Sequence, residues 1–128
     1  MTGGLVFFGG LAGSAGVALS AMAAHYPGAN SLSTAANFLL LHGPAFLALA
    51  ALARTGALPG RALAAGTFML AIGLGLFSGD LVSRALIGTR LFHWAAPIGG
   101  SLLILGWIWL GLAGAFSALG SGKSAKTD

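Results

Sequence analysis

The sequence contains no cysteine, and only 6 % of its 128 residues are charged. A chain without cysteine forms no disulfide, no thiolate nucleophile and no cysteine-ligated metal site. Average soluble domains carry about 25 % charged residues, so a water-soluble globule of this size could not cover its surface with so few. The chain is instead 57 % hydrophobic, with a mean hydropathy of +0.94. This composition indicates an integral membrane protein, because a surface that faces hydrocarbon needs no charged side chains.

The sequence also lacks the patterns on which common activities depend. It has no Ser-His-Asp order, no phosphate-binding loop and no His-Glu-x-x-His motif. The six lysines and arginines give a net charge of +4 but are scattered along the chain, so they form no nucleic-acid patch. We therefore expect a protein that is not an enzyme, binds no nucleic acid and carries no cofactor or metal.

Four apolar runs are long enough to cross a bilayer, at residues 4–24, 35–53, 62–88 and 94–119. The third is the clearest, because residues 62–79 carry no charge at all. The segments that separate the runs are short and rich in turn-forming residues, at 25–34, 54–61 and 89–93. Short connections favour antiparallel neighbours. We expect an all-α, integral membrane four-helix bundle of up-down-up-down topology, forming a single domain over residues 1–119.

The positive charges predict how this bundle is oriented. With four spans, the N-terminus, the second connection and the C-terminal tail share one side, which holds Arg54, Arg61, Lys123 and Lys126. The other side holds Arg90, together with Arg84 if that side chain reaches the interface. By the positive-inside rule, both termini face inward in a multi-pass protein of the inner (plasma) membrane. The polar tail itself, residues 120–128, is expected to be disordered.

Two local features add expectations about single helices. The segment Ala21-Met22-Ala23 is similar to a signal-peptidase site, but no lysine or arginine precedes it. We therefore expect the first helix to be retained, with cleavage as the alternative. Pro44 lies inside the second run, where it removes a backbone donor and predicts a kink near residues 40–42.

Small residues predict close packing between the helices. In the first run they recur at four-residue spacing, as on the small-xxx-small faces of membrane helices. The glycines that we expect at helix contacts are Gly9, Gly13, Gly16, Gly75, Gly79, Gly99, Gly100 and Gly106. Such faces could serve one bundle internally, or they could bind other membrane proteins or a second copy of the chain.

Six polar residues are candidates for chemistry, and the topology places all of them in the outer half of the bundle: His25, Asn37, His42, Asp80, Arg84 and His93. Asp80 and Arg84 are four residues apart, so they share a helix face and can pair. This pair is either a local anchor for the end of a helix or a functional carboxylate site. His42 lies about 10 Å into its helix, too deep for free solvation. It is either a neutral imidazole bonded across helices, or part of a proton relay, a ligand contact, or a metal or haem site.

Four stretches taken together resemble a known family. SAMAAH (20–25) resembles a Gly-Ala-Phe-Gly-Ala-His signature, and FLLLHGPAFLALA (38–50) resembles Tyr-Gln-x-x-His-x-Leu-Ala. FSGDL (77–81) resembles Phe-Ser-Gly-Ser-Leu-Tyr, and PIGGSLLILGW (97–107) resembles Thr-Pro-Ile-Gly-Gly followed by Gly-Trp. In this order they are similar to the small membrane family catalogued as domain of unknown function 423, which includes eukaryotic transmembrane protein 256.

The resemblance implies a four-helix inner-membrane protein with no assigned biochemical activity. It places His25 and His42 on histidine positions of the family. Asp80 stands where the family usually has serine, and Arg84 replaces an apolar residue. The Asp80–Arg84 pair is therefore a feature of this chain to which we assign no family-wide role.

Three functions are open at this point. The first is a non-enzymatic helper or structural subunit that packs against membrane proteins, itself or lipid. The second is a small oligomeric transporter or channel for a proton, an ion or a small apolar molecule. In that case His42 and Asp80 would be the polar sites along the transport path. The third is a metal or haem binder that uses the histidines on the outer side.

Overall fold

The computed structural model of the protein describes residues 1–26 and 30–124. These residues form four α-helices and no strand: α1 (Thr2–His25), α2 (Asn30–Thr55), α3 (Gly60–Leu86) and α4 (Ala95–Ser124). Each helix is long and apolar enough to cross a membrane. The expected all-α membrane bundle is therefore confirmed.

The observed helices extend beyond the predicted ones at several ends. α2 begins at Asn30, so the prediction of a loop through Thr34 was wrong for its second half. The polar residues there suit a first helical turn, in which the Thr34 hydroxyl donates to the Asn30 carbonyl at 2.9 Å. Residues 27–29 of the predicted loop lie outside the described residues. α2 continues without interruption through Pro44, and the kink expected there stays a prediction.

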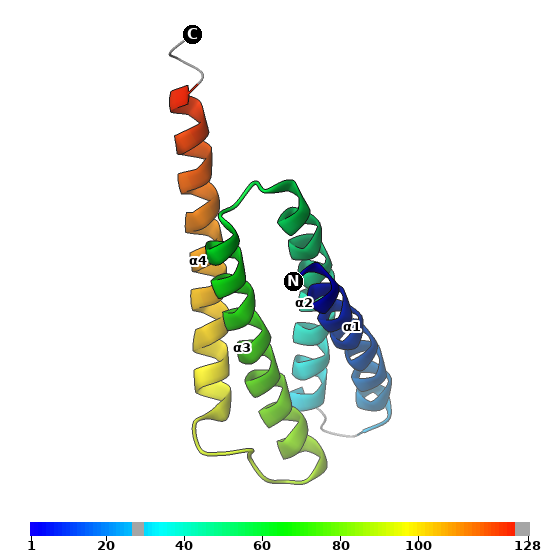
Figure 1. The fold of residues 1–128 in the computed structure, drawn as a ribbon. Coiled ribbons are helices and arrows are strands. Elements are labelled where there is room, and N and C mark those ends of the chain that lie inside the picture. Colours follow the sequence, from blue (N-terminus) through cyan, green and yellow to red (C-terminus); the bar gives the residue numbers. More distant parts are fainter. Residues whose placement is uncertain (27–29, 125–128) are drawn as a thin grey trace.

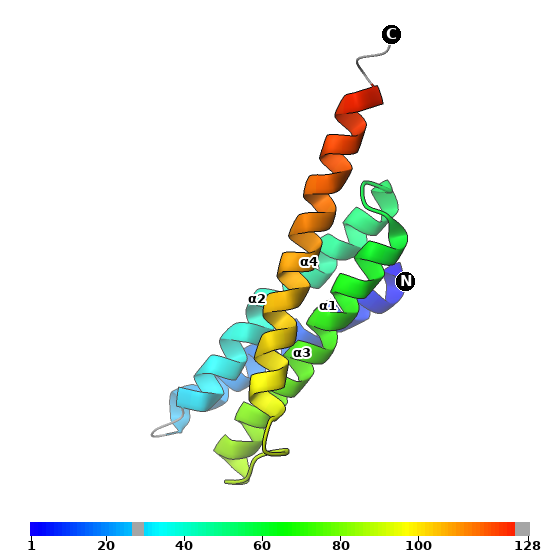
Figure 2. The same ribbon diagram turned by 90° about the vertical axis from the view of Figure 1, so that its left-hand side faces the viewer.

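α4 is longer than expected because the helix continues five residues past Leu119, to Ser124. The prediction of a disordered tail was therefore wrong for residues 120–124, and residues 125–128 lie outside the described part. Adding a residue to an existing helix costs far less than starting one, so α4 propagates into a stretch of weak helix formers. In Figures 1 and 2, the end of α4 projects well beyond the α2–α3 turn.

The four helices are arranged as two antiparallel hairpins, α1–α2 and α3–α4, which meet along α2 and α3. The α2–α3 turn and the end of α4 lie at one end of the molecule (Figure 1). The end of α1, the start of α2 and the α3–α4 connection lie at the other end, as an up-down-up-down bundle requires. The buried core between the hairpins is aliphatic and aromatic, with Phe46 and Leu49 from α2 and Leu63, Leu70 and Leu74 from α3.

Glycines allow the backbones of α1 and α2 to touch. A Cβ atom placed on Gly16 would lie 2.7 Å from Leu40 Cγ and 2.9 Å from the Leu40 backbone nitrogen. A Cβ on Gly43 would lie 3.1 Å from the backbone nitrogen of Gly13. A Cβ on Gly9 would lie 3.0 Å from the Gly43 carbonyl oxygen. Any larger residue at these positions would therefore push the two helices apart.

Glycines also allow the backbones of α3 and α4 to pack closely. A Cβ on Gly99 would lie 2.5 Å from the Phe77 backbone nitrogen and 2.8 Å from the Gly73 carbonyl oxygen. Further along the crossing, a Cβ on Gly106 would lie 2.9 Å from the Leu70 side chain. Because Gly99 faces backbone atoms, which cannot rotate away as a side chain can, this is the tightest point of the second hairpin.

The predicted packing glycines divide into two groups. At four of them a Cβ would crowd the neighbouring helix: Gly9, Gly16, Gly99 and Gly106. Gly13 lies at the same crossing through its backbone, which Gly43 faces, although a Cβ on Gly13 itself would meet no described atom within 4 Å. Gly100 has only an ordinary contact with the Phe77 ring, and Gly79 faces Leu91 of the α3–α4 connection. Gly75 is exposed, and no described atom lies within 4 Å of a Cβ placed there, so its predicted role in helix packing was wrong. The prediction also missed three contact glycines, which are Gly43, Gly66 and Gly73.

We predict that Gly99→Ala lowers the free energy of unfolding by about 1–3 kcal/mol, the usual cost of overpacking a well-packed site. Gly111→Ala on the same helix is the matched control, since a Cβ there meets no described atom within 4 Å. It is expected to be neutral or to stabilise the helix by up to about 1 kcal/mol. Both values follow from unfolding in mixed micelles by SDS, monitored by circular dichroism. Equal stability of the two variants would contradict the assigned backbone contact.

Candidate functional site

The six predicted polar residues do not form one site. Asp80 is fully buried and His42 is 2 % exposed, whereas the Arg84 side chain is 32 % exposed. The remaining three, His25, Asn37 and His93, are exposed to the surroundings of the bundle. In the part of the chain that the structure describes, no three His, Asp or Glu side chains come together in a way that could hold a metal ion. The buried residues belong instead to two separate arrangements, around His42 and around Asp80.

The first arrangement is a hydrogen-bonded chain through His42. Its Nδ1 lies 2.8 Å from the Phe38 carbonyl oxygen one turn earlier in α2. Its Nε2 lies 3.2 Å from the indole Nε1 of Trp107 in α4. An indole nitrogen only donates, so Nε2 must accept, and the ring proton therefore resides on Nδ1, which donates to Phe38. His42 is thus a neutral imidazole with both nitrogens in use.

Aromatic rings enclose this imidazole. The Phe38 ring is stacked on it at 6.0 Å between centroids, and the Trp107 ring lies at 5.9 Å. Phe38 in turn contacts Phe77 of α3 at 4.5 Å. The His42–Trp107 bond therefore lies in an apolar junction where α2 meets both helices of the second hairpin. In such surroundings an unpaired imidazole or indole nitrogen would cost free energy. This hydrogen bond therefore contributes to holding the two hairpins together.

The second arrangement ties the end of α3 to the connection that follows it. Asp80 Oδ2 is paired with the Arg84 guanidinium one turn later. Asp80 Oδ1 accepts the backbone N–H of Leu91 at 2.9 Å. Nearby, the Ser83 hydroxyl donates to the Thr89 carbonyl at 2.8 Å. The two side chains on α3 thus hold the α3–α4 connection against the helix end, so the carboxylate works as a local anchor.

Two buried polar atoms have no hydrogen-bond partner among the described residues, Ser78 Oγ and Arg84 Nε. The Arg84 guanidinium donates to Asp80 through Nη2, while its Nε has no acceptor among the described residues. Ser78 lies on α3 two residues before Asp80. We assign neither atom a chemical role.

Sequence reasoning missed the partner of His42. Trp107 is 65 residues away, and no local spacing connects the two. The available signal was the indole N–H itself, which needs an acceptor wherever it is removed from water. Trp109 shows the same requirement, because its Nε1 donates to the Ala62 carbonyl at the start of α3 at 2.9 Å.

Comparison with known proteins gives a consistent result. A family model described as "Protein of unknown function (DUF423)" matches residues 19–100, more than half of the chain. A Haemophilus influenzae protein described as "UPF0382 membrane protein" is 46 % identical over 37 residues. That alignment covers 29 % of this chain and 30 % of the relative. No solved structure matches the chain.

We predict that His42 and Trp107 are energetically coupled. In a double-mutant cycle with His42→Leu and Trp107→Phe, the coupling free energy should be about 0.6 kcal/mol and at most about 1.7 kcal/mol, the range for hydrogen bonds between membrane helices. The free energy of unfolding of the four proteins in mixed micelles measures it. The control cycle pairs His42→Leu with Trp94→Phe, whose ring lies against His93, and should give no coupling. Coupling of equal size in both cycles would count against the bond.

The Asp80–Arg84 pair should respond asymmetrically to substitution. Arg84→Leu leaves a fully buried carboxylate without its counter-charge, which costs about 3–5 kcal/mol. Asp80→Asn keeps an oxygen for the Leu91 N–H and leaves a partly exposed guanidinium that can extend to the interface, so the loss should be about 1 kcal/mol. Unfolding in mixed micelles compares the two variants. A larger loss in Asp80→Asn would refute this assignment.

Proposed function

The chain belongs to the membrane protein family described as protein of unknown function DUF423, and from that premise we propose that it is a non-enzymatic helper or structural subunit. It would act by packing its apolar surface against other membrane proteins or lipid. The observation that carries this proposal is the state of His42, whose two ring nitrogens are both engaged within the chain. A metal site or a haem site would need one of those nitrogens to be free. A proton relay would need partners that can both give and take a proton, whereas a backbone carbonyl only accepts and an indole N–H only donates.

Other intramembrane polar groups support the same conclusion. The Thr67 hydroxyl donates to the Leu63 carbonyl at 2.7 Å, which satisfies it within its own helix. Each carboxylate oxygen of Asp80 has a partner, Arg84 on Oδ2 and the Leu91 N–H on Oδ1. Polar groups that serve transport usually face a water-filled path or one another across it. Here the named groups pair within the chain, either inside one helix or between segments of the bundle, which supports a structural role.

The outer surface is the part available to partners. α1 and α4 carry large exposed apolar side chains, among them Phe7 and Val17 on the first and Ile104, Ile108 and Phe116 on the last. The glycines at the two tight crossings are already covered by neighbouring helices. Partner contacts would therefore use the bulky faces of α1 and α4 rather than the glycine faces singled out from the sequence.

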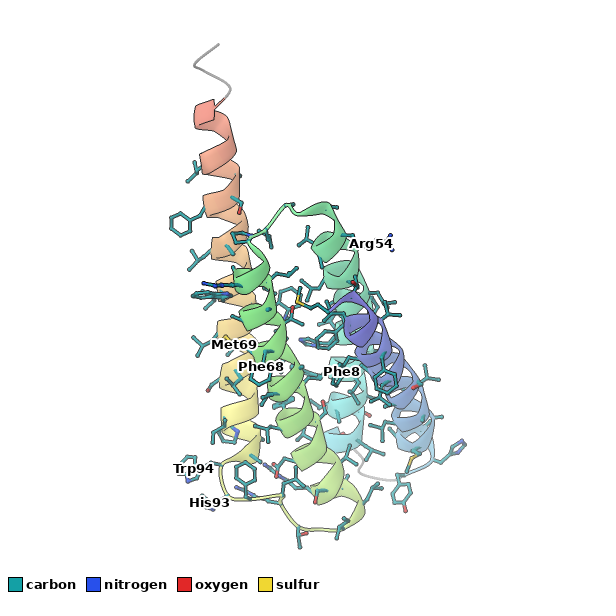
Figure 3. The ribbon with its side chains drawn as sticks, in the orientation of Figure 1. Phe8, Arg54, Phe68, Met69, His93 and Trp94 are labelled. Carbon is teal, nitrogen blue, oxygen red and sulfur yellow. The ribbon has the colours of Figure 1, made fainter. Side chains whose placement is uncertain are left out.

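The proposed location is the inner membrane, with both termini inward. Arg54 lies beside the α2–α3 turn, at the same end of the bundle as the end of α4 (Figure 3). His93 and Trp94 lie at the opposite end of the bundle (Figure 3). This distribution supports the orientation expected from the positive-inside rule.

The proposal predicts that the protein carries no flux of its own. Purified protein in liposomes that enclose a pH-sensitive dye should leave proton leakage at the level of empty liposomes, with His42→Leu and Trp107→Phe giving the same result. The two variants are matched, because each removes the α2–α4 hydrogen bond but only the first removes the imidazole. Proton flux in the wild type that survives Trp107→Phe and disappears in His42→Leu would show that His42 transfers protons and would overturn the proposal. A protein without flux that also purifies from its membrane free of protein and lipid would contradict the helper role.

A further inference from the structure

Two apolar grooves flank α4 at the end of the bundle that carries the α2–α3 turn. The larger, of about 650 Å³, lies between α2 and α4, and its lining includes Leu49, Leu52, Trp107, Leu110 and Gly114. The smaller, of about 460 Å³, lies between the start of α3 and α4, and its lining includes Ala62, Trp109, Leu112 and Phe116. Both volumes fall within the range of about 300–1,000 Å³ that is usual for small-molecule sites.

The grooves exist because α4 carries small residues where it runs past the α2–α3 turn. Gly111 and Gly114 line the larger groove, and no described atom lies within 4 Å of a Cβ placed on either. Ser117 lies in the linings of both grooves, so the two hollows approach each other on this helix. α2 ends and α3 begins at the turn, whereas α4 continues beyond it (Figures 1 and 2). Neither neighbouring helix therefore fills the space beside these small residues.

Both grooves also reach the same short segment, residues 57–62. Ala57 and Leu58 line the larger groove, and Pro59 and Ala62 line the smaller one. Arg61 lies in this segment with an exposed side chain, and Arg54 is exposed in the last turn of α2. The only carboxylate side chain within residues 1–26 and 30–124 is Asp80, about 28 Å further along α3. The segment that both grooves reach therefore carries an exposed positive charge, and no carboxylate of the described residues lies near it.

We propose that these grooves bind one anionic diacyl phospholipid, with an acyl chain on each side of α4 and the phosphate beside Arg61. Two separate apolar hollows that open at one cationic segment match two chains joined to one anionic headgroup. A transmembrane helix, about 10 Å across, would need one continuous face instead of two grooves. Basic residues near the membrane surface favour anionic lipids by electrostatic attraction. This inference rests on the lipid contact in the proposed function and needs no protein partner.

The test measures retained lipid by native mass spectrometry. The protein is reconstituted with equal amounts of phosphatidylglycerol and phosphatidylcholine of identical chains, and then released from detergent. The wild type is expected to retain an equimolar amount of phosphatidylglycerol in preference to phosphatidylcholine. Arg61→Gln should reduce this preference about fivefold, the effect of one basic residue near an anionic surface. Arg90→Gln, at the opposite end of the bundle, is the charge control and should leave the preference unchanged.

Filling the larger groove tests the apolar half of the site. Gly114→Leu should release most of the bound lipid while the protein stays folded, because the new side chain points into open space. Gly10→Leu on α1 is the matched control, since it is equally open but lies outside both grooves, and should retain the lipid.

Equal retention of both lipids by the wild type, or equal effects of Arg61→Gln and Arg90→Gln, would overturn the proposed lipid site. So would a Gly114→Leu variant that keeps its lipid but changes its oligomeric mass, because a second copy would then be the occupant. Proton flux measured on the same samples reports separately on the proposed function.

Discussion

Direct contact between helix backbones is the constraint on which the structure depends. At Gly16 and Gly43 in the first hairpin, and at Gly73 and Gly99 in the second, there is no room for a side-chain carbon between the two chains. In hydrocarbon, water does not drive apolar helices together, so the close van der Waals packing that glycine permits must supply the association. The bulky side chains are thereby directed outward, which is why so many of them face lipid.

The polar residues work within this framework as links between segments. His42 connects α2 to α4, and Asp80 connects the end of α3 to the segment that follows it. Each link joins parts of the chain that the glycine contacts leave apart, namely the two hairpins in one case and a helix and its connection in the other. The few buried polar groups thus add specific links to hairpins that already pack through the apolar core between α2 and α3.

Sequence reasoning succeeded where the information was local. The spans followed from runs of uncharged residues, and the Asp80–Arg84 pair followed from a separation of four on one helix face. It failed where the partner was distant. Nothing near His42 points to Trp107, so the sequence left several roles for the histidine open. Gly43, Gly66 and Gly73 were missed because a glycine's contact depends on the helix opposite, which the spacing within one run does not reveal.

The ends of helices were also poorly predicted, for a physical reason. Composition marks Asn30–Thr34 and residues 120–124 as polar, but polar residues extend a helix readily once a long apolar segment has nucleated it. Membrane thickness limits the apolar part of a helix and leaves its polar ends free to continue. At these two ends, boundaries read from hydropathy therefore mark the span and fall short of the helix, whereas the predicted end of the third helix at residue 88 lies two residues past the observed end at Leu86.

The glycine contacts within each hairpin have a consequence for biosynthesis. Each hairpin is completed by segments adjacent in the chain, so α1 and α2 can close on each other before the ribosome has made α4. His42 is then already in place, while its tryptophan partner is 65 residues behind. At about 5–20 residues per second, roughly 3 to 13 seconds of translation separate the two. During that interval the Nδ1 of His42 already has the Phe38 carbonyl of its own helix, whereas its Nε2 has no indole donor until α4 arrives.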